Sequence, residues 1–367
     1  MAGRVFLIDG TAMAYRAHFA FERAGLTDQA GRPTGAAFGF LRQLQRVLRQ
    51  EKPSHLAVAF DGPEKTFRHE RYPAYKATRD KTPDDLVAQI PDIEALVKAL
   101  NLPFLVEAGW EADDLIGALA IKAAAAGHEV FIVTADKDFA QLVDGRIRMA
   151  SFPKGGSDLD LIGPAEVEEK WGVPPERIRD LLALMGDASD NVPGVPGIGP
   201  KTAVKLIAEH GGLEEVLGAA EDMPKSKMRE RLIDHADDAR LSYELVTIGD
   251  AAPVPDGLEP LTVGEPDMDA LRDVLTRLEF HAIIDEYALG GGEAADSSAW
   301  TCVDSDEQLR DLVARLGACG EAGFAFDTEA TSADAHTAEI VGASFSWADG
   351  EAAYVPFNAA PCLMGGR

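Results

Sequence analysis

The segment RVFLIDGTAMAYR (Arg4–Arg16) joins a short apolar run, Val5–Ile8, directly to an acidic residue. A continuous apolar run bounded by polar residues is typical of a strand that is buried on both faces. The chain repeats this pattern at Leu56–Phe60 and Val130–Val133, and each run ends on an Asp or just short of one. We therefore predict three buried parallel strands, each followed by an acid.

The intervals between these runs have helical periodicity. They are Ala37–Arg49, Leu86–Leu100 and Asp113–Ala125. Alternating strands and helices predict an α/β fold, an open and mostly parallel sheet covered by helices. Functional sites in such sheets lie outside the carboxyl ends of the strands, so we expect Asp9, Asp61 and Asp136 to lie close together.

The rest of the chain divides by pattern into three further parts. Residues 160–245 read as all-helical, and a helical pattern returns at Met268–Leu278. The stretch LGGGEAADSSA (289–299) is typical of a flexible linker, and FAFDTEAT, EIVGASFSW and EAAYVPF after it predict three strands. We expect a core over 1–165, a helical region over 166–288, the linker over 289–299, and a separate segment over 300–367.

Composition bounds the function. The chain has 367 residues, a net charge of −27 and three cysteines without CxxC spacing, so we expect neither disulfides nor zinc, and a cytoplasmic location. No run of 18 apolar residues occurs, so we expect no membrane partner. The acidic total argues against nucleic acid, but residues 65–81 carry six bases against two acids, a local balance of +4.

Nine carboxylates stand out. They are Asp9, Asp61, Glu111, Asp113, Asp114, Asp136, Asp138, Asp187 and Asp190. Each alone fits a helix N-terminus, a cap or a loop. Gathered in one cleft they would repel strongly unless some were protonated or divalent cations neutralised them. Oxygen ligands without His or Cys favour Mg²⁺ or Mn²⁺ over zinc, and two such ions about 4 Å apart suit phosphodiester cleavage.

The basic segment 65–81 interleaves cations with aromatic residues. Tyr72 precedes Lys76 by four residues and Tyr75 precedes Arg79 by four, a spacing that places each pair on one helical face. Cations beside aromatic rings suit single-stranded DNA, although a solvated surface helix has the same appearance. Pro73 would break a single helix, so we expect two short helices or an arch.

The glycine-rich stretch GVPGIGPKTA (Gly194–Ala203) is not a Walker loop, because Pro200 rather than a Lys follows Gly199. It also lacks the third Gly of a dinucleotide fingerprint and follows no strand. A tight hairpin between helices remains, whose backbone can hold a phosphate at a helix N-terminus. A purely structural turn is the alternative.

Five motifs then resemble, in order, those of the 5′-nuclease domain of bacterial DNA polymerase I, a family that includes flap endonucleases. They are LIDGTAMAYRAHFA, FDGPEKTFRHERYPAYKATR, WEADDLIG, TADKDFAQLV and GDASDNVPGVPGIGPKTAVKL. The resemblance covers residues 1 to about 288. It implies a PIN-like, Rossmann-like sheet with an arch at 64–82, and a helix-hairpin-helix at 190–206.

The resemblance also implies roles for single residues. Around one metal ion it places Asp9, Asp61, Glu111, Asp113 and Asp114, and around the other Asp136, Asp138, Asp187 and Asp190. It places Lys76 and Arg79 on the scissile phosphate. As further DNA contacts it gives Arg16, Arg68, Tyr75, Gly194, Gly197, Gly199, Lys201, Thr202 and Lys205, with K⁺ at the hairpin.

The implied activity is that of a Mg²⁺- or Mn²⁺-dependent 5′-3′ exonuclease and flap endonuclease that removes primers during DNA replication and repair. The implied partner is DNA with a 5′ flap, nick or junction, bound by a monomer. Three rivals stay open: a non-catalytic DNA clamp, a PIN-type RNase, and an aspartyl-phosphate phosphatase, which lacks its nucleophile because Leu7 stands two residues before Asp9.

The segment FAFDTEAT (Phe324–Thr331) resembles the first acidic motif of a 3′–5′ exonuclease domain of the RNase H-like α/β class. Asp327 and Glu329 lie two apart on the expected strand and so share a face. Two carboxylates cannot hold a pair of Mg²⁺ ions. We therefore expect an incomplete domain without exonuclease activity.

Overall fold

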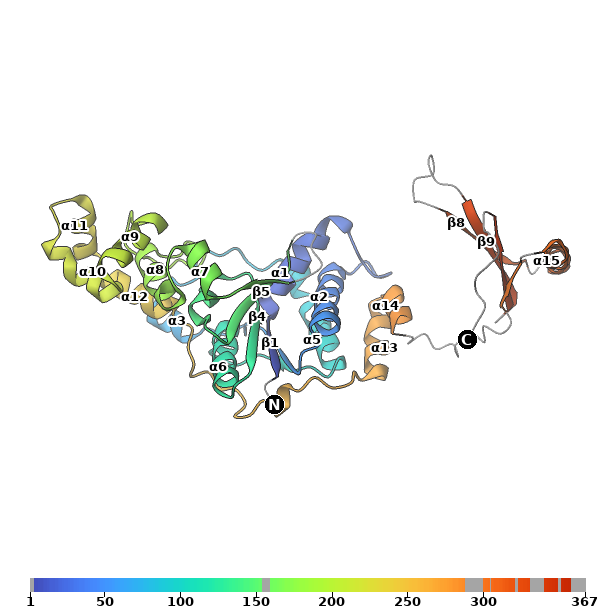
Figure 1. Cartoon of the computed structure of the whole chain (residues 1–367), viewed down its shortest axis with the longest axis horizontal. Coiled ribbons are helices and arrows are strands. Elements are labelled where there is room, and N and C mark those ends of the chain that lie inside the picture. The colour runs from blue at the N-terminus through green and yellow to red at the C-terminus, as the bar shows by residue number, and fades with distance from the viewer. Residues whose placement is uncertain are drawn as a thin grey trace. The chain divides into compact units, whose positions relative to one another are not determined.

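A computed structural model describes residues 3–153, 159–287, 300–303, 305–320, 323–330, 340–348 and 351–357. The chain divides into two compact units, 1–289 and 290–367, which are described separately (Figure 1). The expected linker 289–299 lies outside the described residues. Within the described ranges, no helix is long and apolar enough to cross a membrane.

The first unit is built on a six-stranded sheet of order β3-β2-β1-β4-β5-β6. Its strands are β1 (Arg4–Asp9), β2 (His55–Ala59), β3 (Phe104–Leu105), β4 (Glu129–Val133), β5 (Ile147–Ser151) and β6 (Asp160–Ile162). All neighbours pair in parallel except β5 and β6. The predicted α/β class and its mostly parallel sheet are confirmed.

Alternate residues of the central strands face two different cores, as the period of a strand requires. Val5 and Leu7 of β1 pack on the face covered by α6 (Ala112–Ala125), whereas Phe6 and Ile8 pack on the face covered by α1 (Gly10–Phe21) and α2 (Gly35–Arg46). Figure 1 shows α6 and α2 on opposite sides of the sheet. Burial on both faces explains why the strands are apolar without alternation.

The connections around the sheet are helical and mostly short. Besides α1, α2 and α6 they contain η1 (Glu22–Ala24), η2 (Val47–Glu51), α3 (Phe67–Arg71), α4 (Asp84–Val87), α5 (Ile90–Ala99) and η3 (Lys137–Leu142). The expected arch is α3 followed by turns, because Pro73 cannot continue the helix. Tyr72, Tyr75, Lys76 and Arg79 therefore do not lie on a common helical face.

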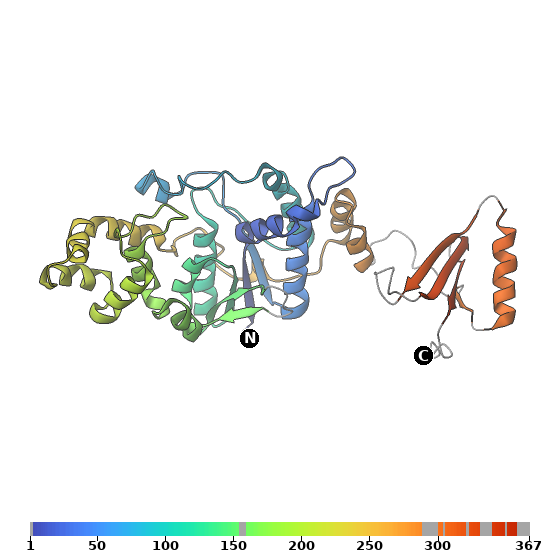
Figure 2. The ribbon, with the colours of Figure 1, turned by 90° about the horizontal axis from the view of Figure 1, so that it is seen from above.

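The region after the sheet is helical, as predicted, except that residues 160–162 form the edge strand β6. Its elements are α7 (Pro164–Trp171), η4 (Pro175–Arg177), α8 (Ile178–Met185), α9 (Pro200–His210), α10 (Leu213–Ala219), η5 (Ala220–Asp222), α11 (Lys227–Asp234) and α12 (Ala236–Val246). After η6 (Glu259–Leu261), α13 (Met268–Arg277) and α14 (His281–Glu286) pack against α5 and α2 on the side away from the sheet. Figure 2 shows α8–α12, in green and yellow, at the end of this unit opposite α13 and α14.

The second unit has a four-stranded sheet of order β7-β10-β9-β8. Its elements are β7 (Trp300–Cys302), α15 (Asp306–Ala318), β8 (Ala325–Ala330), β9 (Ile340–Ala348) and β10 (Glu351–Pro356). Asp327 and Glu329 lie on the edge strand β8 and are exposed. The three expected strands are present as β8, β9 and β10.

A buried ion pair fastens the helical region to the sheet. The Arg68 guanidinium on α3 donates to both carboxylate oxygens of Asp114 on α6, at 2.7 and 2.9 Å. It also donates to the carbonyl oxygens of Leu245 and Thr247, at the end of α12, at 2.8 Å each. The Arg68 and Asp114 side chains are 2% and 0% exposed. One arginine thus connects three segments.

We expect Arg68→Ala to lower the free energy of unfolding in urea by about 3–5 kcal/mol, because it leaves the Asp114 carboxylate buried and unpaired. The matched control is Arg71→Ala, one helical turn away, whose partner Glu244 is exposed and whose loss should change stability little. Equal losses in the two variants would contradict the role given to Arg68.

Candidate active site

Three carboxylates lie at the carboxyl ends of neighbouring strands, as predicted. Asp9 ends β1 and caps α1, accepting from the Ala12 N–H at 2.9 Å, and its second oxygen accepts from the Thr134 hydroxyl at 2.8 Å. Asp61 follows β2 and accepts from the Ala112 N–H at 2.9 Å. Asp136 follows β4 and accepts from the Asp138 N–H at 3.0 Å. Strand ends and helix starts therefore orient each carboxylate.

The first turn of α6 adds Glu111 and Asp113 to the same place. Burial, and then the charges of Asp9, Asp136, Asp61 and Glu111, raise the pKa of Asp113 well above its ordinary value. Burial also raises the pKa of Asp9 from 3.8 to about 6, helped by the nearby charges of Asp61 and Asp136. These shifts are those of carboxylates crowded together away from water.

Asp138, Asp187 and Asp190 form the other side of the site. Burial, and then the charge of Asp136, raise the pKa of Asp138 to about 7. Its Oδ1 atom is buried and has no hydrogen-bond partner. Asp187 and Asp190 lie in the loop after α8, where an isolated bridge between Asp187 and Val192 closes a tight turn.

Cationic side chains form ion pairs with several of these carboxylates. The Lys76 ammonium lies 2.9 Å from Glu111 and 4.0 Å from Asp190, and the Arg79 guanidinium pairs with Asp190. Lys137 pairs with Asp187 and lies 3.6 Å from Asp138. Sequence reasoning missed Lys137, although its place between Asp136 and Asp138 was the available signal.

The segment after α3 is docked onto the acidic loop. The Lys76 N–H donates to the Asp190 carbonyl oxygen at 2.8 Å, and the Asn191 amide donates to the Ala74 carbonyl oxygen at 2.7 Å. Lys76 and Asn191 both have positive φ, 56° each, which costs non-glycine residues energy. This strained contact brings Lys76 and Arg79 to the carboxylates.

Tyr75 does not take the expected place. Its side chain is 4% exposed, and its hydroxyl contacts Glu111 at 3.2 Å and Asp190 at 3.1 Å. Burial and those two carboxylates raise its pKa, so the hydroxyl donates to them. In this structure the ring is not available for stacking on a base, because it is packed beneath the turn that carries Lys76.

Arg68 and Asp114 are paired with each other in this structure. Arg68 was expected to contact phosphate and Asp114 to bind a metal ion, but they are buried against each other. Asp114 also accepts from the Gly249 N–H at 2.9 Å, so its oxygens are occupied. A motif match cannot separate a carboxylate that faces the cleft from one a residue later that faces the core.

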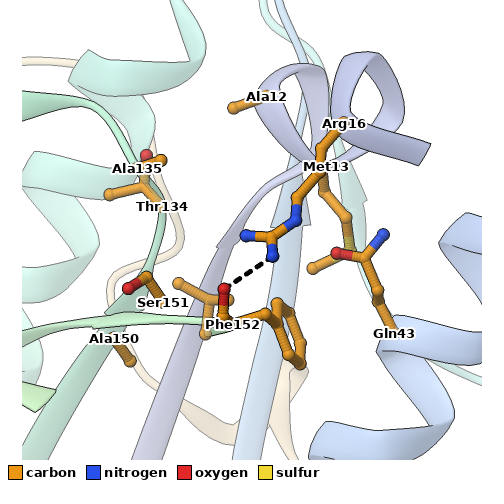
Figure 3. Close-up of a pocket in the computed structure, with 10 residues that line it drawn as sticks. Ala12, Met13, Arg16, Gln43, Thr134, Ala135, Ala150, Ser151 and Phe152 are labelled. Carbon is orange, nitrogen blue, oxygen red and sulfur yellow. Dashed lines mark hydrogen bonds between the residues drawn. The ribbon is translucent and has the colours of Figure 1, made fainter. Parts of the chain in front are cut away.

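Arg16 lies beside a small cavity of about 50 Å³ next to the strand ends. Its guanidinium donates to the Phe152 carbonyl oxygen at 2.6 Å and lies 5.7 Å from the centre of the Phe152 ring (Figure 3). The arginine is exposed, which is compatible with the expected phosphate contact.

The glycine hairpin lies between α8 and α9, as predicted. Gly194 is buried, has a φ of 60°, and approaches the Gly186 backbone more closely than a Cβ atom would allow. Its N–H donates to the Ser242 hydroxyl at 2.9 Å, so its role here is structural. Gly197 and Gly199 are exposed at the start of α9, and so are Lys201 and Lys205, with Thr202 half-buried between them.

The chemical type of the donor atoms at this site suits divalent cations. The donors are all oxygens, several carboxyls are forced toward protonation, and Asp138 Oδ1 lacks a partner. As the side chains lie, no group of three His, Cys, Asp or Glu residues within the described ranges is close enough to hold an ion. The carboxylates instead accept from N–H groups and pair with Lys76, Arg79 and Lys137. To bind a metal ion, their side chains would have to rotate away from these partners.

Comparisons with known proteins agree with this fold. A family model described as the 5′-3′ exonuclease N-terminal resolvase-like domain matches residues 4–172, and one described as the 5′-3′ exonuclease C-terminal SAM fold matches residues 173–269. The T5 5′-exonuclease, solved with divalent metal ions (zinc), is 21% identical with a TM-score of 0.58, over 76% of this chain and 98% of its own. The catalytic core of Rad2 with a DNA substrate is 19% identical with a TM-score of 0.54, over 78% and 92%.

Curated relatives have higher sequence identity. DNA polymerase I of Pseudomonas aeruginosa is 43% identical over 95% of this chain, and the thermostable DNA polymerase I of Thermus thermophilus is 42% identical over 78%. The chain spans 39% and 33% of the length of these two relatives. Both family models and both relatives lead to one conclusion: this chain belongs to the 5′-3′ exonuclease family found in DNA polymerase I.

Proposed function

We propose that this chain is a 5′-3′ exonuclease and 5′-flap endonuclease that hydrolyses DNA phosphodiester bonds with two Mg²⁺ or Mn²⁺ ions. The observation that carries this proposal is the gathering of carboxylates at one edge of a parallel sheet. They come from three strand ends, the starts of α6 and η3 and the loop after α8, with three cations among them. Family membership supports the nuclease class. The proposed biological setting is primer removal and nick translation in replication and repair.

The proposal assigns two sets of ligands. Asp9, Asp61, Glu111 and Asp113 would hold the first ion, and Asp136, Asp138, Asp187 and Asp190 would hold the second. Bound divalent ions supply a water of lowered pKa and charge stabilisation for the leaving oxygen. The chain's own part is to orient its carboxylates through the Ala12, Ala112 and Asp138 N–H groups.

Lys76 and Arg79 are proposed to hold the scissile phosphate. Both lie on the docked turn above the carboxylates and can exchange a carboxylate for a phosphate oxygen without a change of fold. Arg16 is proposed as a further phosphate contact at the strand ends. Arg68, Tyr75 and Asp114 are left out of the proposed contacts, because Arg68 and Asp114 are paired with each other and the Tyr75 hydroxyl donates to Glu111 and Asp190.

The exposed hairpin is proposed to grip duplex DNA through Gly197, Gly199, Lys201, Thr202 and Lys205, with K⁺ at its carbonyl oxygens. A helix N-terminus beside lysines suits a phosphate of the backbone. The monomeric state, the cytoplasmic location and the boundaries at residues 165 and 288 stay predictions.

Asp138→Asn should abolish cleavage of a labelled 5′-flap DNA in Mg²⁺, while flap affinity stays within a few-fold or tightens. Asp138 is proposed as a metal ligand rather than a DNA contact, and losing a negative charge near DNA favours binding. Asp256→Asn is the matched control, since Asp256 is exposed and pairs only loosely with Lys122, at 3.7 Å. Cleavage near the wild-type rate in Asp138→Asn would refute the two-metal assignment.

The same assay tests the function as a whole. Wild-type protein should release the 5′ flap only when Mg²⁺ or Mn²⁺ is present. A DNA clamp would bind without cleaving, an RNase would prefer an RNA strand, and a phosphatase would remove only a terminal phosphate. Any of those three outcomes would replace the proposal.

Lys76→Ala and Lys201→Ala should fail in different ways. We expect Lys76→Ala to slow single-turnover cleavage about 10²–10³-fold with little loss of affinity, because its cation acts on charge that develops in the transition state. Lys201→Ala should weaken duplex binding and flatten its salt dependence by about one phosphate contact. Lys98→Ala, an exposed lysine paired with Glu94, is the control. If Lys76→Ala and Lys201→Ala lost rate and affinity in equal proportion, the division of roles would be wrong.

A further inference from the structure

Lys137 connects two acidic segments that are distant in sequence. It is the first residue of η3 and stands between Asp136 and Asp138. Its ammonium pairs with Asp187 Oδ2, in the loop after α8, and lies 3.6 Å from Asp138 Oδ1. The site residues named from sequence do not include it, and it lies outside the turn that carries Lys76 and Arg79.

This contact is more sheltered than an ordinary surface ion pair. The Asp187 and Asp138 side chains are 10% and 15% exposed, and that of Lys137 is 34% exposed. Exposed ion pairs contribute little, but sheltered charges interact more strongly and are costly to leave unpaired. Lys137 therefore compensates two carboxylates that would otherwise repel each other.

The same contact leaves one oxygen unsatisfied. Asp138 Oδ1 is buried without a hydrogen-bond partner, because 3.6 Å from the Lys137 ammonium exceeds hydrogen-bond range. A buried acceptor of this kind is rare in folded proteins and calls for an explanation such as an ion that belongs there. A single ammonium satisfies Asp187 but cannot reach both carboxylates fully.

We propose that Lys137 is a built-in counter-ion of the second metal position: its ammonium neutralises Asp138 and Asp187 in the metal-free protein and leaves them when a divalent cation binds. This inference rests on the proposed function, since it assumes that these carboxylates are metal ligands. It makes Lys137 a positioning residue, because it acts through the two carboxylates and holds the loop of Asp187 against η3.

One consequence is a difference in affinity between the two metal positions. At the second position Asp138 and Asp187 face the Lys137 ammonium and Asp190 pairs with Arg79, so an entering ion has to displace several like charges. At the first position Glu111 pairs with Lys76, whereas Asp9 and Asp61 accept from backbone N–H groups and carry no ion pair within the described residues. The second ion should therefore bind more weakly than the first. Lys137 thus sets the divalent concentration at which the site fills.

The test is calorimetric titration of the full chain with Mn²⁺, without DNA. Lys137→Met keeps the aliphatic stem and removes the charge, and Lys137→Arg keeps the charge. We expect Lys137→Met to tighten the weaker Mn²⁺ site roughly tenfold. A neighbouring charge shifts the pKa of a carboxyl by about one unit or more, which is a tenfold change in the equilibrium constant, and we expect an effect of similar size on metal binding. Lys137→Arg should stay near wild type, and so should Lys122→Met, a lysine away from the site.

The outcomes separate the two proposals. If wild-type protein binds no Mn²⁺, the proposed metal-dependent function fails. If wild type binds two ions and Lys137→Met binds the weaker ion equally well or less well, the counter-ion role is overturned. Metal binding is read directly, so a slower enzyme alone would not be mistaken for support.

A second measurement needs no variant and holds even if Lys137→Met does not fold. Wild-type protein is labelled with an amine-reactive ester in EDTA and in Mn²⁺, and labelling is quantified for each lysine by mass spectrometry. We expect Lys137 to be protected in EDTA and to become several-fold more reactive in Mn²⁺, relative to Lys122. Reactivity of Lys137 that is unchanged or lower in Mn²⁺ would contradict its displacement.

Discussion

Repulsion among carboxylates at one edge of a parallel sheet is the constraint that the rest of this structure accommodates. Strands β2, β1 and β4 end side by side, and α6 begins beside them, so Asp9, Asp61, Asp136 and Asp113 are brought together by topology. Two unit charges 4 Å apart repel by about 4 kcal/mol at an effective dielectric constant of about 20. Backbone N–H donors, a shift toward protonation and nearby cations each relieve part of this repulsion.

The need to compensate the charge of the carboxylates also positions the segments around the site. The turn after α3 is held in a strained conformation because Lys76 and Tyr75 satisfy Glu111 and Asp190. The loop after α8 is held by Lys137. The cations that would contact DNA and the carboxylates that would bind metal ions are thus paired with one another in the free protein. Binding of DNA or metal exchanges these partners and needs no new arrangement of the site. Arg68 and Asp114 are different, because their burial connects the helical region to the sheet whether or not the site is filled.

Local patterns predicted the sheet and the acidic cluster because both depend on short-range rules. The runs Val5–Ile8 and Val130–Val133 are apolar throughout since they are buried on both faces. The edge strand β6 was missed because three residues, two of them exposed, leave no such pattern. Burial of Tyr75 and the pairing of Arg68 with Asp114 could not be read from sequence, because each depends on a contact across at least 36 positions. Lys137 was overlooked for the same reason, since its partner lies 50 positions away.

Thermal unfolding of the metal-free protein as a function of pH tests most directly whether the acidic cluster is unstable without divalent cations. The pKa values of Asp9 and Asp138 are raised from 3.8 to about 6 and about 7, so ionisation costs more in the folded than in the unfolded state. Stability in EDTA should therefore fall as pH rises from about 4 to about 7, and Mg²⁺, which binds only the folded site, should reverse the fall. The Asp9→Asn, Asp138→Asn double variant serves as the reference for titration elsewhere in the chain. We predict that the unfolding midpoint of the wild type drops more steeply with pH than that of the double variant, and that Mg²⁺ raises the wild-type midpoint selectively at pH 8. Parallel pH profiles for the two proteins, with no selective effect of Mg²⁺, would contradict the account.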